Sequence, residues 1–442
     1  MLIRNAILAD GRERDVRVRG ETIDAVGTDL AAGDERVVNA AGKRLLPGMI
    51  DAHVHFRQPG FPHKETWATG SRSAAAGGVT TVVDQPNTDP PTVDGEQFDR
   101  KLALAADSLV DFGINGGVTA DWDPDSLFDR PLFALGEVFL ADSTGDMGID
   151  ADLFAAAVAA ATERDVTVTV HAEDATLFDE SVLPRRTENA SGEGTDPRAD
   201  PPEREDADAW SAYRTAAAEA AAVERACEVA REHDARIHVA HTSTPEGIDA
   251  ASEAGMTCEV TPHHLLLSRE DLDDLGTFGR MNPPLRSEQR RAAVFERVVD
   301  GTVDVIATDH APHTRAEKDA SIWEAPSGVP GVETALPLLL ALARDGDLSY
   351  ERVRDLTAAN PAAVFDLPSK GRIVEGADAD LVLVDPDATR EIRGAALHSK
   401  CDWTPFEGFE GVFPEWTMVR GTVVYEREGD SFAAHDGENV RG

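Results

Sequence analysis

The stretch Met-Ile-Asp-Ala-His-Val-His-Phe, residues 49–56, is the starting point for predicting the fold of this sequence. It has the length of a buried strand, and polar side chains gather where it ends. Because alternate residues of a strand point the same way, His53 and His55 share one face. Two neutral imidazoles on one face can hold one metal ion, although two packed or surface histidines would also explain the pattern.

Seven further stretches of strand length follow, and Ala-rich amphipathic helices such as Ala216–Glu232 lie between several of them. These stretches are residues 79–84, 112–118, 134–140, 166–171, 236–241, 257–260 and 303–308. Eight strands alternating with helices predict an α/β fold, a closed (β/α)8 TIM barrel. An open doubly wound sheet is the alternative, but no GxGxxG motif follows the first strand.

Short alternating stretches at both ends of the chain, including residues 417–425 as one strand, predict a small β domain formed from the N- and C-terminal segments. We expect this domain to comprise residues 1–46 and 366–426, with the barrel, residues 47–365, inserted between them. Residues 427–442 predict a frayed acidic tail. The polar stretch 180–208, rich in Pro, Gly and charge, predicts a long loop or insertion after the fifth strand.

The chain is strongly acidic, with 82 Asp and Glu residues against 42 Lys and Arg and a net charge of −40. Such a field repels nucleic acid and anionic membranes, so neither is an expected partner. A surface adapted to high salt, where ions screen the self-repulsion, explains the imbalance most simply, and an ordinarily acidic protein is the alternative.

No segment of the sequence predicts secretion or membrane insertion. The N-terminus lacks the features of a signal peptide, and no apolar run approaches the roughly 20 residues of a membrane span, so we expect a cytoplasmic protein. The three cysteines lie far apart and form no CxxC pair, which predicts small buried residues in a reducing compartment.

Metal-ligating side chains recur at the ends of the predicted strands. His171 ends the fifth strand, His241 the sixth and Asp309 the eighth. In a barrel the carboxyl ends of the strands meet at one rim, so these residues and the first two histidines are predicted to form one metal site. Imidazole and carboxylate ligands together suit zinc.

Several longer motifs make the reading more specific. They are DAHVHFRQPG (51–60), Lys64-Glu65, AAAGGVTTVVD (74–84), Pro86-Asn87-Thr88, TDHAPH (308–313) and PGVET (330–334). Their sequences and their order resemble those of the dihydroorotases, a group within the amidohydrolase superfamily. The resemblance covers nearly the whole chain, including the β domain divided between the two ends.

The resemblance implies roles for individual residues. His53, His55, His171, His241 and Asp309 would be ligands of one or two zinc ions. Arg57 and Asn87 would hold a free carboxylate of the substrate, a task that suits a bidentate guanidinium, although a surface ion pair and a turn residue are the plainer readings. His313 would contact the substrate ring or carboxylate, or else cap a helix. Asn282 would touch the ring, or else brace its loop.

One position departs from the pattern of these relatives. Many of them have a carboxylated lysine at the end of the fourth strand, where it bridges two metal ions. Here Gly-Glu-Val-Phe-Leu, residues 136–140, occupies that place, with Glu137 at the lysine position. The glutamate could bridge two cations without modification. It could also support a single metal from the outer sphere, or face away from the site.

The activity implied by the resemblance is the reversible hydrolysis and cyclisation between L-dihydroorotate and N-carbamoyl-L-aspartate, in de novo pyrimidine biosynthesis. Zinc would activate water for attack on the ring carbonyl, with Asp309 as general acid and base. Allantoinase and dihydropyrimidinase are rival activities, and a non-catalytic scaffold subunit is a rival of another class. The expected partner is a small-molecule substrate, and the sequence leaves a homodimer open.

Overall fold

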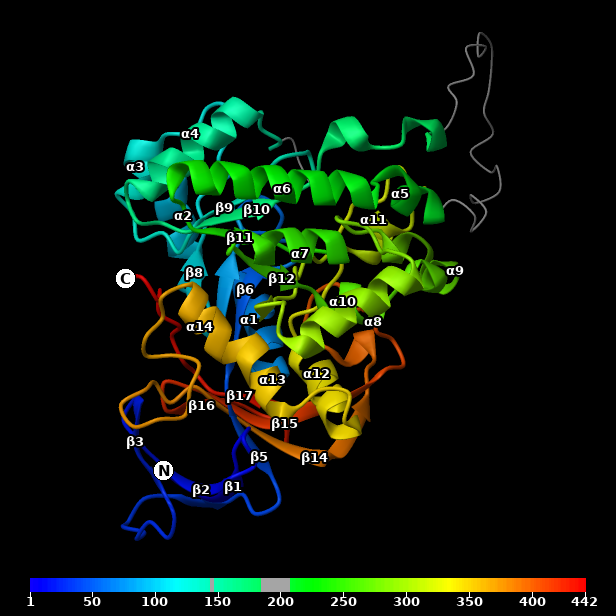
Figure 1. Cartoon of the computed structure of the whole chain (residues 1–442). Coiled ribbons are helices and arrows are strands. Elements are labelled where there is room, and N and C mark those ends of the chain that lie inside the picture. The colour runs from blue at the N-terminus through cyan, green and yellow to red at the C-terminus, as the bar shows by residue number, and fades with distance from the viewer. Residues whose placement is uncertain (144–146, 184–206) are drawn as a thin grey trace.

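The computed structural model describes residues 1–143, 147–183 and 207–442, and its centre is a barrel of eight parallel strands (Figure 1). The strands are β6 (Met49–Val54), β7 (Val79–Asp84), β8 (Asp111–Ile114), β9 (Leu135–Phe139), β10 (Val168–His171), β11 (Ile237–Val239), β12 (Thr257–Val260) and β13 (Val305–Ile306). Strands β6–β8 pair in order, and so do β9–β13. A bridge from Gly116 to Leu135 joins the two sets, and one from Val54 to His310 closes the ring. The predicted TIM barrel is confirmed, strand by strand.

Helices cover the outside of the barrel, as Figure 1 shows. The longer ones are α1 (Trp67–Gly77), α2 (Gly95–Ala105), α4 (Ala151–Thr162), α6 (Ala216–His233), α7 (Pro245–Glu253), α10 (Glu288–Asp300) and α12 (Ala335–Asp345). The shorter ones are α3 (Pro124–Phe128), α5 (Ala207–Tyr213), α8 (Pro262–Leu266), α9 (Leu272–Leu275), α11 (Arg315–Lys318), α13 (Tyr350–Arg354) and α14 (Asn360–Val364). Helix α6 begins where Thr215 accepts a hydrogen bond from the Ala218 backbone, and its buried alanines allow close packing on the strands.

The main core lies between the strands and these helices. It joins the strand residues Val82, Val138 and Val170 to helix residues such as Ala157 and Ala226, all of them buried. Burying one valine side chain contributes roughly 1.5–3 kcal/mol. This packing holds the strands in place and so fixes the rim from which the polar side chains project.

The two ends of the chain form one nine-stranded sheet. Its strands are β1 (Leu2–Ile7), β2 (Glu13–Arg19), β3 (Thr22–Gly27), β4 (Val37–Asn39), β5 (Arg44–Pro47), β14 (Leu381–Glu391), β15 (Glu410–Val419), β16 (Thr422–Glu426) and β17 (Ser431–Phe432). Strands β5 and β14 pair antiparallel, with Leu45 opposite Leu383, and this pairing joins the N-terminal half to the C-terminal half. Residues 417–425, predicted as one strand, are two strands with a turn between them at Arg420 and Gly421, both at positive φ.

The C-terminal segment lies against the barrel, so the prediction of a frayed tail is wrong. The Phe112 backbone N–H donates to Glu438 O, and the Val440 N–H donates to Phe112 O, each at 2.9 Å. Arg420 forms an ion pair with the Glu438 carboxylate at 2.6 Å. Glu438, an acidic residue of the segment predicted as a tail, is therefore paired with a buried arginine.

Of the stretch predicted as an insertion, 180–208, residues 184–206 lie outside the described part of the chain, and α5 begins at Ala207. Cys227, Cys258 and Cys401 are buried and form no disulfide, as predicted. Within the described residues, no helix combines the length and apolar content needed to cross a bilayer.

Candidate active site

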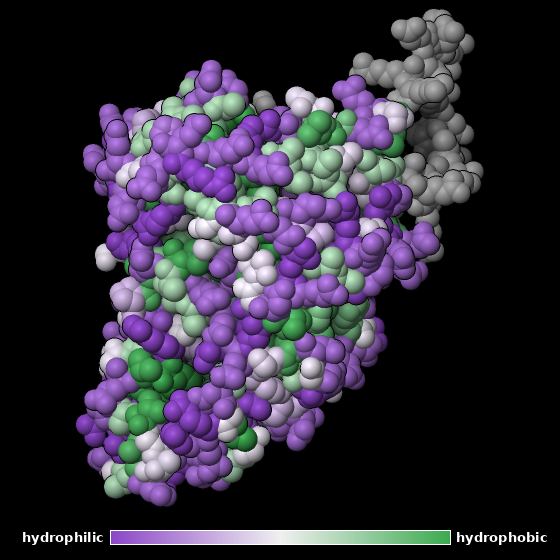
Figure 2. All heavy atoms as spheres, in the orientation of Figure 1, coloured by the Kyte–Doolittle hydropathy of each residue, from purple (hydrophilic) through white to green (hydrophobic). Residues whose placement is uncertain are grey.

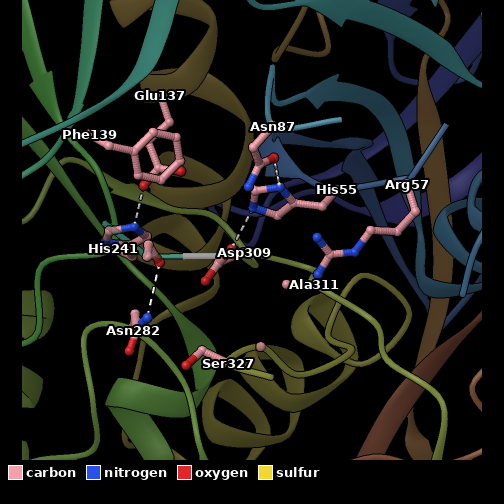
Figure 3. Close-up of a pocket in the computed structure, with 12 residues that line it drawn as sticks. His55, Arg57, Asn87, Glu137, Phe139, His241, Asn282, Asp309, Ala311 and Ser327 are labelled. Carbon is pink, nitrogen blue, oxygen red and sulfur yellow. Dashed lines mark hydrogen bonds and ion pairs between the residues drawn. The ribbon is translucent and has the colours of Figure 1, made fainter. Parts of the chain in front are cut away.

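A cavity opens at the rim formed by the carboxyl ends of the barrel strands (Figure 3). The residues that line it are His55, Arg57, Asn87, Glu137, Phe139, Ser143, His241, Asn282, Asp309, Ala311, Ser327 and Gly328. In Figure 3, Glu137 and His241 lie on one side and His55 and Arg57 on the other, with Asp309 between them. Side chains that are more than 250 residues apart in the chain, such as those of His55 and Asp309, therefore meet, because parallel strands end at the same rim.

His55 is held with one ring nitrogen facing the carboxylate of Asp309. Its Nδ1 lies 2.7 Å from Asn87 Oδ1, and its Nε2 lies 2.9 Å from Asp309 Oδ1. Because an amide oxygen only accepts, Nδ1 carries the hydrogen. In this tautomer the lone pair of Nε2 faces the site and is free to bind a cation.

His53 lies beneath the cavity between three carboxylates. Its Nδ1 is 2.7 Å from Glu259 Oε1. Its buried Nε2 has no hydrogen-bond partner, but faces Glu137 Oε2 at 3.4 Å and Asp309 Oδ1 at 3.6 Å. Burial lowers the pKa of His53, but the charges of Glu137 and Glu259 outweigh burial and hold this pKa well above its ordinary value. A cation at this position would replace the proton on Nε2.

Glu137 points into the site and contacts two further histidines. Its Oε1 lies 2.5 Å from His241 Nε2 and 3.1 Å from His171 Nδ1. The reading in which Glu137 faces away is therefore wrong. Its second oxygen, Oε2, is the atom that faces His53, so the carboxylate lies between the histidines of three different strands.

The donor atoms fit a cluster of cations. Two sets of three residues each bring their ligand atoms within 4.8 Å of one another, and all are buried. One set is His53, Glu137 and His241, and the other is His53, His55 and Asp309. The unpartnered Nε2 of His53 belongs to both. Buried imidazole nitrogens and carboxylates gathered in this way are the donor set that transition metals bind in proteins.

An outer layer of carboxylates orients the histidines, and the sequence analysis missed it. Glu259, on β12, contacts His53 and also His238 Nε2 at 3.2 Å. Glu173 accepts from His171 Nε2 at 2.9 Å and pairs with Arg214. Burial raises the pKa of each carboxyl group, but its cationic partners outweigh burial and hold the pKa far below the ordinary value. The sequence signal for this layer is a glutamate inside an otherwise apolar strand, as at position 259. A buried carboxylate requires a polar or charged partner, so it predicts a nearby donor.

Arg57 and Asn87 lie on the same side of the cavity. Burial lowers the pKa of Arg57 to about 10, so its guanidinium remains charged at neutral pH. Its Nε donates to Pro312 O at 3.2 Å. Within the described residues, no carboxylate forms an ion pair with this buried guanidinium, so it is suited to an anionic group of a ligand.

His313 and Asn282 are placed differently from each other. His313 is not among the lining residues; it lies behind Arg57, with Nδ1 accepting from Lys64 at 3.1 Å and Nε2 donating to Ser327 O at 2.9 Å. Asn282 lines the cavity, and its Nδ2 donates to Ser143 Oγ at 3.1 Å.

Five lining residues were not predicted, namely Phe139, Ser143, Ala311, Ser327 and Gly328. Four of them lie in loops, where sequence spacing does not indicate which side chain faces inward. Gly328 is required by its surroundings. Its φ is +130°, and a Cβ there would meet Ala311 O at 2.6 Å.

Comparison with known proteins agrees with this geometry. The family model named Amidohydrolase family matches residues 44–424. A dihydroorotase of Halobacterium salinarum is 68% identical over 441 residues, covering 100% of this chain and 99% of that protein. A dihydroorotase of Methanosarcina acetivorans is 41% identical, covering 98% and 92%.

Among solved structures, an L-hydantoinase (dihydropyrimidinase) from Arthrobacter aurescens superposes with a TM-score of 0.89 at 26% identity, covering 99% of this chain and 98% of that one. A D-hydantoinase (dihydropyrimidinase) from a Thermus species has a TM-score of 0.84 at 27% identity, covering 100% and 98%. The chain belongs to the amidohydrolase family, and within that family to the dihydroorotases.

Proposed function

We propose that this chain is a dihydroorotase that interconverts L-dihydroorotate and N-carbamoyl-L-aspartate in the cytoplasm, as part of pyrimidine biosynthesis. The observation that carries the proposal is the arrangement of one cavity, in which a buried charged Arg57 faces a cluster of metal-ligating side chains. The dihydroorotases to which the chain is similar support the same activity. In this proposal the barrel, residues 47–365, carries the site, and residues 1–46 and 366–426 form the supporting domain.

The proposed cofactor is zinc, as two ions. His53, His55 and Asp309 would hold one ion, and His171 and His241 would hold the other. Glu137 would bridge them, because its Oε1 faces the second pair of histidines while its Oε2 faces His53. No carboxylated lysine is needed in this arrangement. Glu259 and Glu173 would fix the ring orientations of His53 and His171.

When bound, the metal ions would lower the pKa of a water molecule and polarise the carbonyl group under attack. Asp309 would take a proton on its carboxylate and pass it to the departing ring nitrogen. Its Oδ1 lies between His55 Nε2, at 2.9 Å, and His53 Nε2, at 3.6 Å. In the biosynthetic direction Asp309 would take the proton of the ureido nitrogen as the ring closes.

Arg57 and Asn87 would hold the carboxylate of the substrate that does not react. The side-chain oxygen of Asn87 is taken by His55, so its amide N–H groups are what it can offer to an anion. His313 would act indirectly, by donating its Nε2–H to the carbonyl oxygen of Ser327, which is a lining residue of the cavity. Holding the reacting groups together in this way makes ring closure effectively unimolecular.

Dihydropyrimidinase activity is the second candidate, because the solved structures named above share the whole fold. Its substrates lack a ring carboxylate, so Arg57 would have no partner in them. The test is to assay ring opening of dihydroorotate, dihydrouracil and allantoin side by side. The proposal requires turnover of dihydroorotate to exceed that of the others by orders of magnitude. Equal or greater turnover of dihydrouracil would overturn it.

We also propose that the protein is adapted to high salt. The net charge of −40 supports this, as does the origin of the 68% identical relative in Halobacterium salinarum. Figure 2 shows hydrophilic side chains over most of the visible face. Concentrated salt would screen the mutual repulsion of the excess acidic side chains.

A further inference from the structure

The side-chain amide of Asn282 is held in one orientation by a residue outside the cavity. Trp210, on α5, donates its indole N–H to Asn282 Oδ1 at 2.9 Å, and the same N–H lies 3.2 Å from Met281 O. Both side chains are buried, with Trp210 9% exposed and Asn282 5%. An indole nitrogen can only donate, so the amide oxygen must be the atom that faces Trp210.

The orientation of the oxygen determines where the amide nitrogen lies. Asn282 Nδ2 donates to Ser143 Oγ at 3.1 Å, and Ser143 and Asn282 both line the cavity, whereas Trp210 does not. The nitrogen is therefore on the cavity side of the amide. One of its two hydrogens is used by Ser143, and the other remains for a ligand.

The indole itself is fixed on several sides. Its ring centroid lies 5.8 Å from that of Tyr213 and 5.9 Å from that of Trp323. The guanidinium of Arg280 stacks 3.7 Å from the indole centroid, and Arg280 Nε donates to Ser327 Oγ at 3.1 Å. Trp210 cannot turn away from Asn282 without breaking this packing.

We propose that Trp210 is a positioning residue that keeps the amide nitrogen of Asn282 facing the cavity as a hydrogen-bond donor. The free N–H of this amide would bind a carbonyl oxygen of the substrate ring. The inference rests on the proposed function for the identity of the substrate. Without the indole N–H, the amide can rotate by 180° and present its oxygen, which would repel a carbonyl oxygen instead of binding it.

The test compares Trp210→Phe with Trp323→Phe. Each change removes an indole N–H from the same aromatic cluster, but only Trp210 contacts Asn282. We expect Trp210→Phe to raise the KM for dihydroorotate about fivefold to twentyfold, the loss expected for one oriented hydrogen bond, with kcat within about twofold of the wild type. Trp323→Phe should leave both constants nearly unchanged. Equal effects of the two changes would overturn the proposal.

A double-mutant cycle separates positioning from general packing. In an Asn282→Ala background, Trp210→Phe should have no further effect on KM, because the residue through which it acts is gone. If Trp210→Phe raises the KM in that background as much as it does in the wild type, the proposal is contradicted. If Trp210→Phe does not fold, Asn282→Asp takes its place in the test. It keeps an oxygen for the indole but removes the N–H donors, and a KM near that of the wild type would contradict the inference.

Crystal structures of the wild type and Trp210→Phe test the positioning without any turnover. We expect the Asn282–Ser143 hydrogen bond in the wild type and a rotated Asn282 amide in the variant. An unchanged amide overturns the inference even if the protein is a dihydroorotase. A wild-type protein that does not turn over dihydroorotate, with this rotation present, would instead refute the proposed function.

Discussion

At the scale of single residues, the proposed pair of metal ions depends on Glu137. It contacts His171 and His241 through one oxygen and faces His53 through the other. No described residue besides Glu137 faces both groups of ligands in this way.

We predict that Glu137→Ala lowers the metal content from about two ions per chain to about one. The kcat should fall at least about a hundredfold, because the loss of a ligand displaces the remaining metal ion and its histidine ligands. Elemental analysis of the purified variant, together with its turnover of dihydroorotate, provides the measurement. Glu415→Ala, which removes a surface partner of Lys43, is the matched control. An unchanged metal content in Glu137→Ala would refute the bridge.

A substitution of Arg57 tests how the substrate carboxylate is recognised, separately from the role of the metal. Arg57→Lys keeps a positive charge but loses the planar pair of N–H donors. We expect kcat/KM for dihydroorotate to fall about tenfold to a hundredfold, mainly through KM, with the metal content unchanged. Steady-state kinetics at matched metal occupancy is the measurement. If Arg57→Lys bound dihydroorotate as tightly as the wild type, the carboxylate would have to be held elsewhere.

At the scale of elements, Lys370 joins the barrel to the terminal sheet. Its buried Nζ lies 2.7 Å from Asp111 on β8 and 2.6 Å from Asp380, the residue before β14. Burial lowers the pKa of Lys370, but the two carboxylates outweigh burial and raise it above its ordinary value of 10.5. This contribution to stability is fully present below pH about 10.5 and is lost as the pH rises through the raised pKa.

We predict that Lys370→Met destabilises the fold by about 3 kcal/mol, because it leaves two buried carboxylates without their shared cation. Thermal unfolding at pH 8 and at pH above about 10.5 checks this. The wild type should lose stability over that interval, and the variant should lose less. Lys43→Met, which removes a partly exposed lysine from a pair with Glu415, is the control and should change the Tm little. A Tm of Lys370→Met equal to that of the wild type would contradict the account.

The elements were predicted well, and the reason is local. Each barrel strand is a short apolar run between turn residues, so the local sequence is enough to predict it. The hairpin at 417–425 was missed because β-prone residues stand directly on both sides of the short turn at Arg420 and Gly421. The packed C-terminal segment was missed because its partners, Asp111 and Phe112, lie more than 300 residues earlier.

The candidate site was predicted in part for the same reason. His53, His55, His171, His241 and Asp309 stand at strand ends, a position that sequence pattern reveals. Glu259 and Trp210 act through partners that only the folded chain brings near, so their contacts with His53 and Asn282 could not be read from spacing.

At the scale of the whole molecule, the net charge of −40 predicts that stability depends on salt. At low ionic strength the Debye length grows, and the repulsion among surface carboxylates is less screened. We predict that the Tm falls steeply as NaCl is reduced from about 3 M to about 0.1 M, where the Debye length is about 10 Å. Circular dichroism at a series of salt concentrations is the measurement. A Tm that stayed constant across this range would favour an ordinarily acidic protein.

The central claim is that residues far apart in the chain meet around metal ions and open a cyclic amide. The most direct test is to titrate zinc into chelator-treated wild-type protein in high-salt buffer while following dihydroorotate turnover. The account predicts no turnover without metal and full turnover once about two ions are bound per chain. Full activity in metal-free protein would contradict it, and so would zinc binding that restored no turnover.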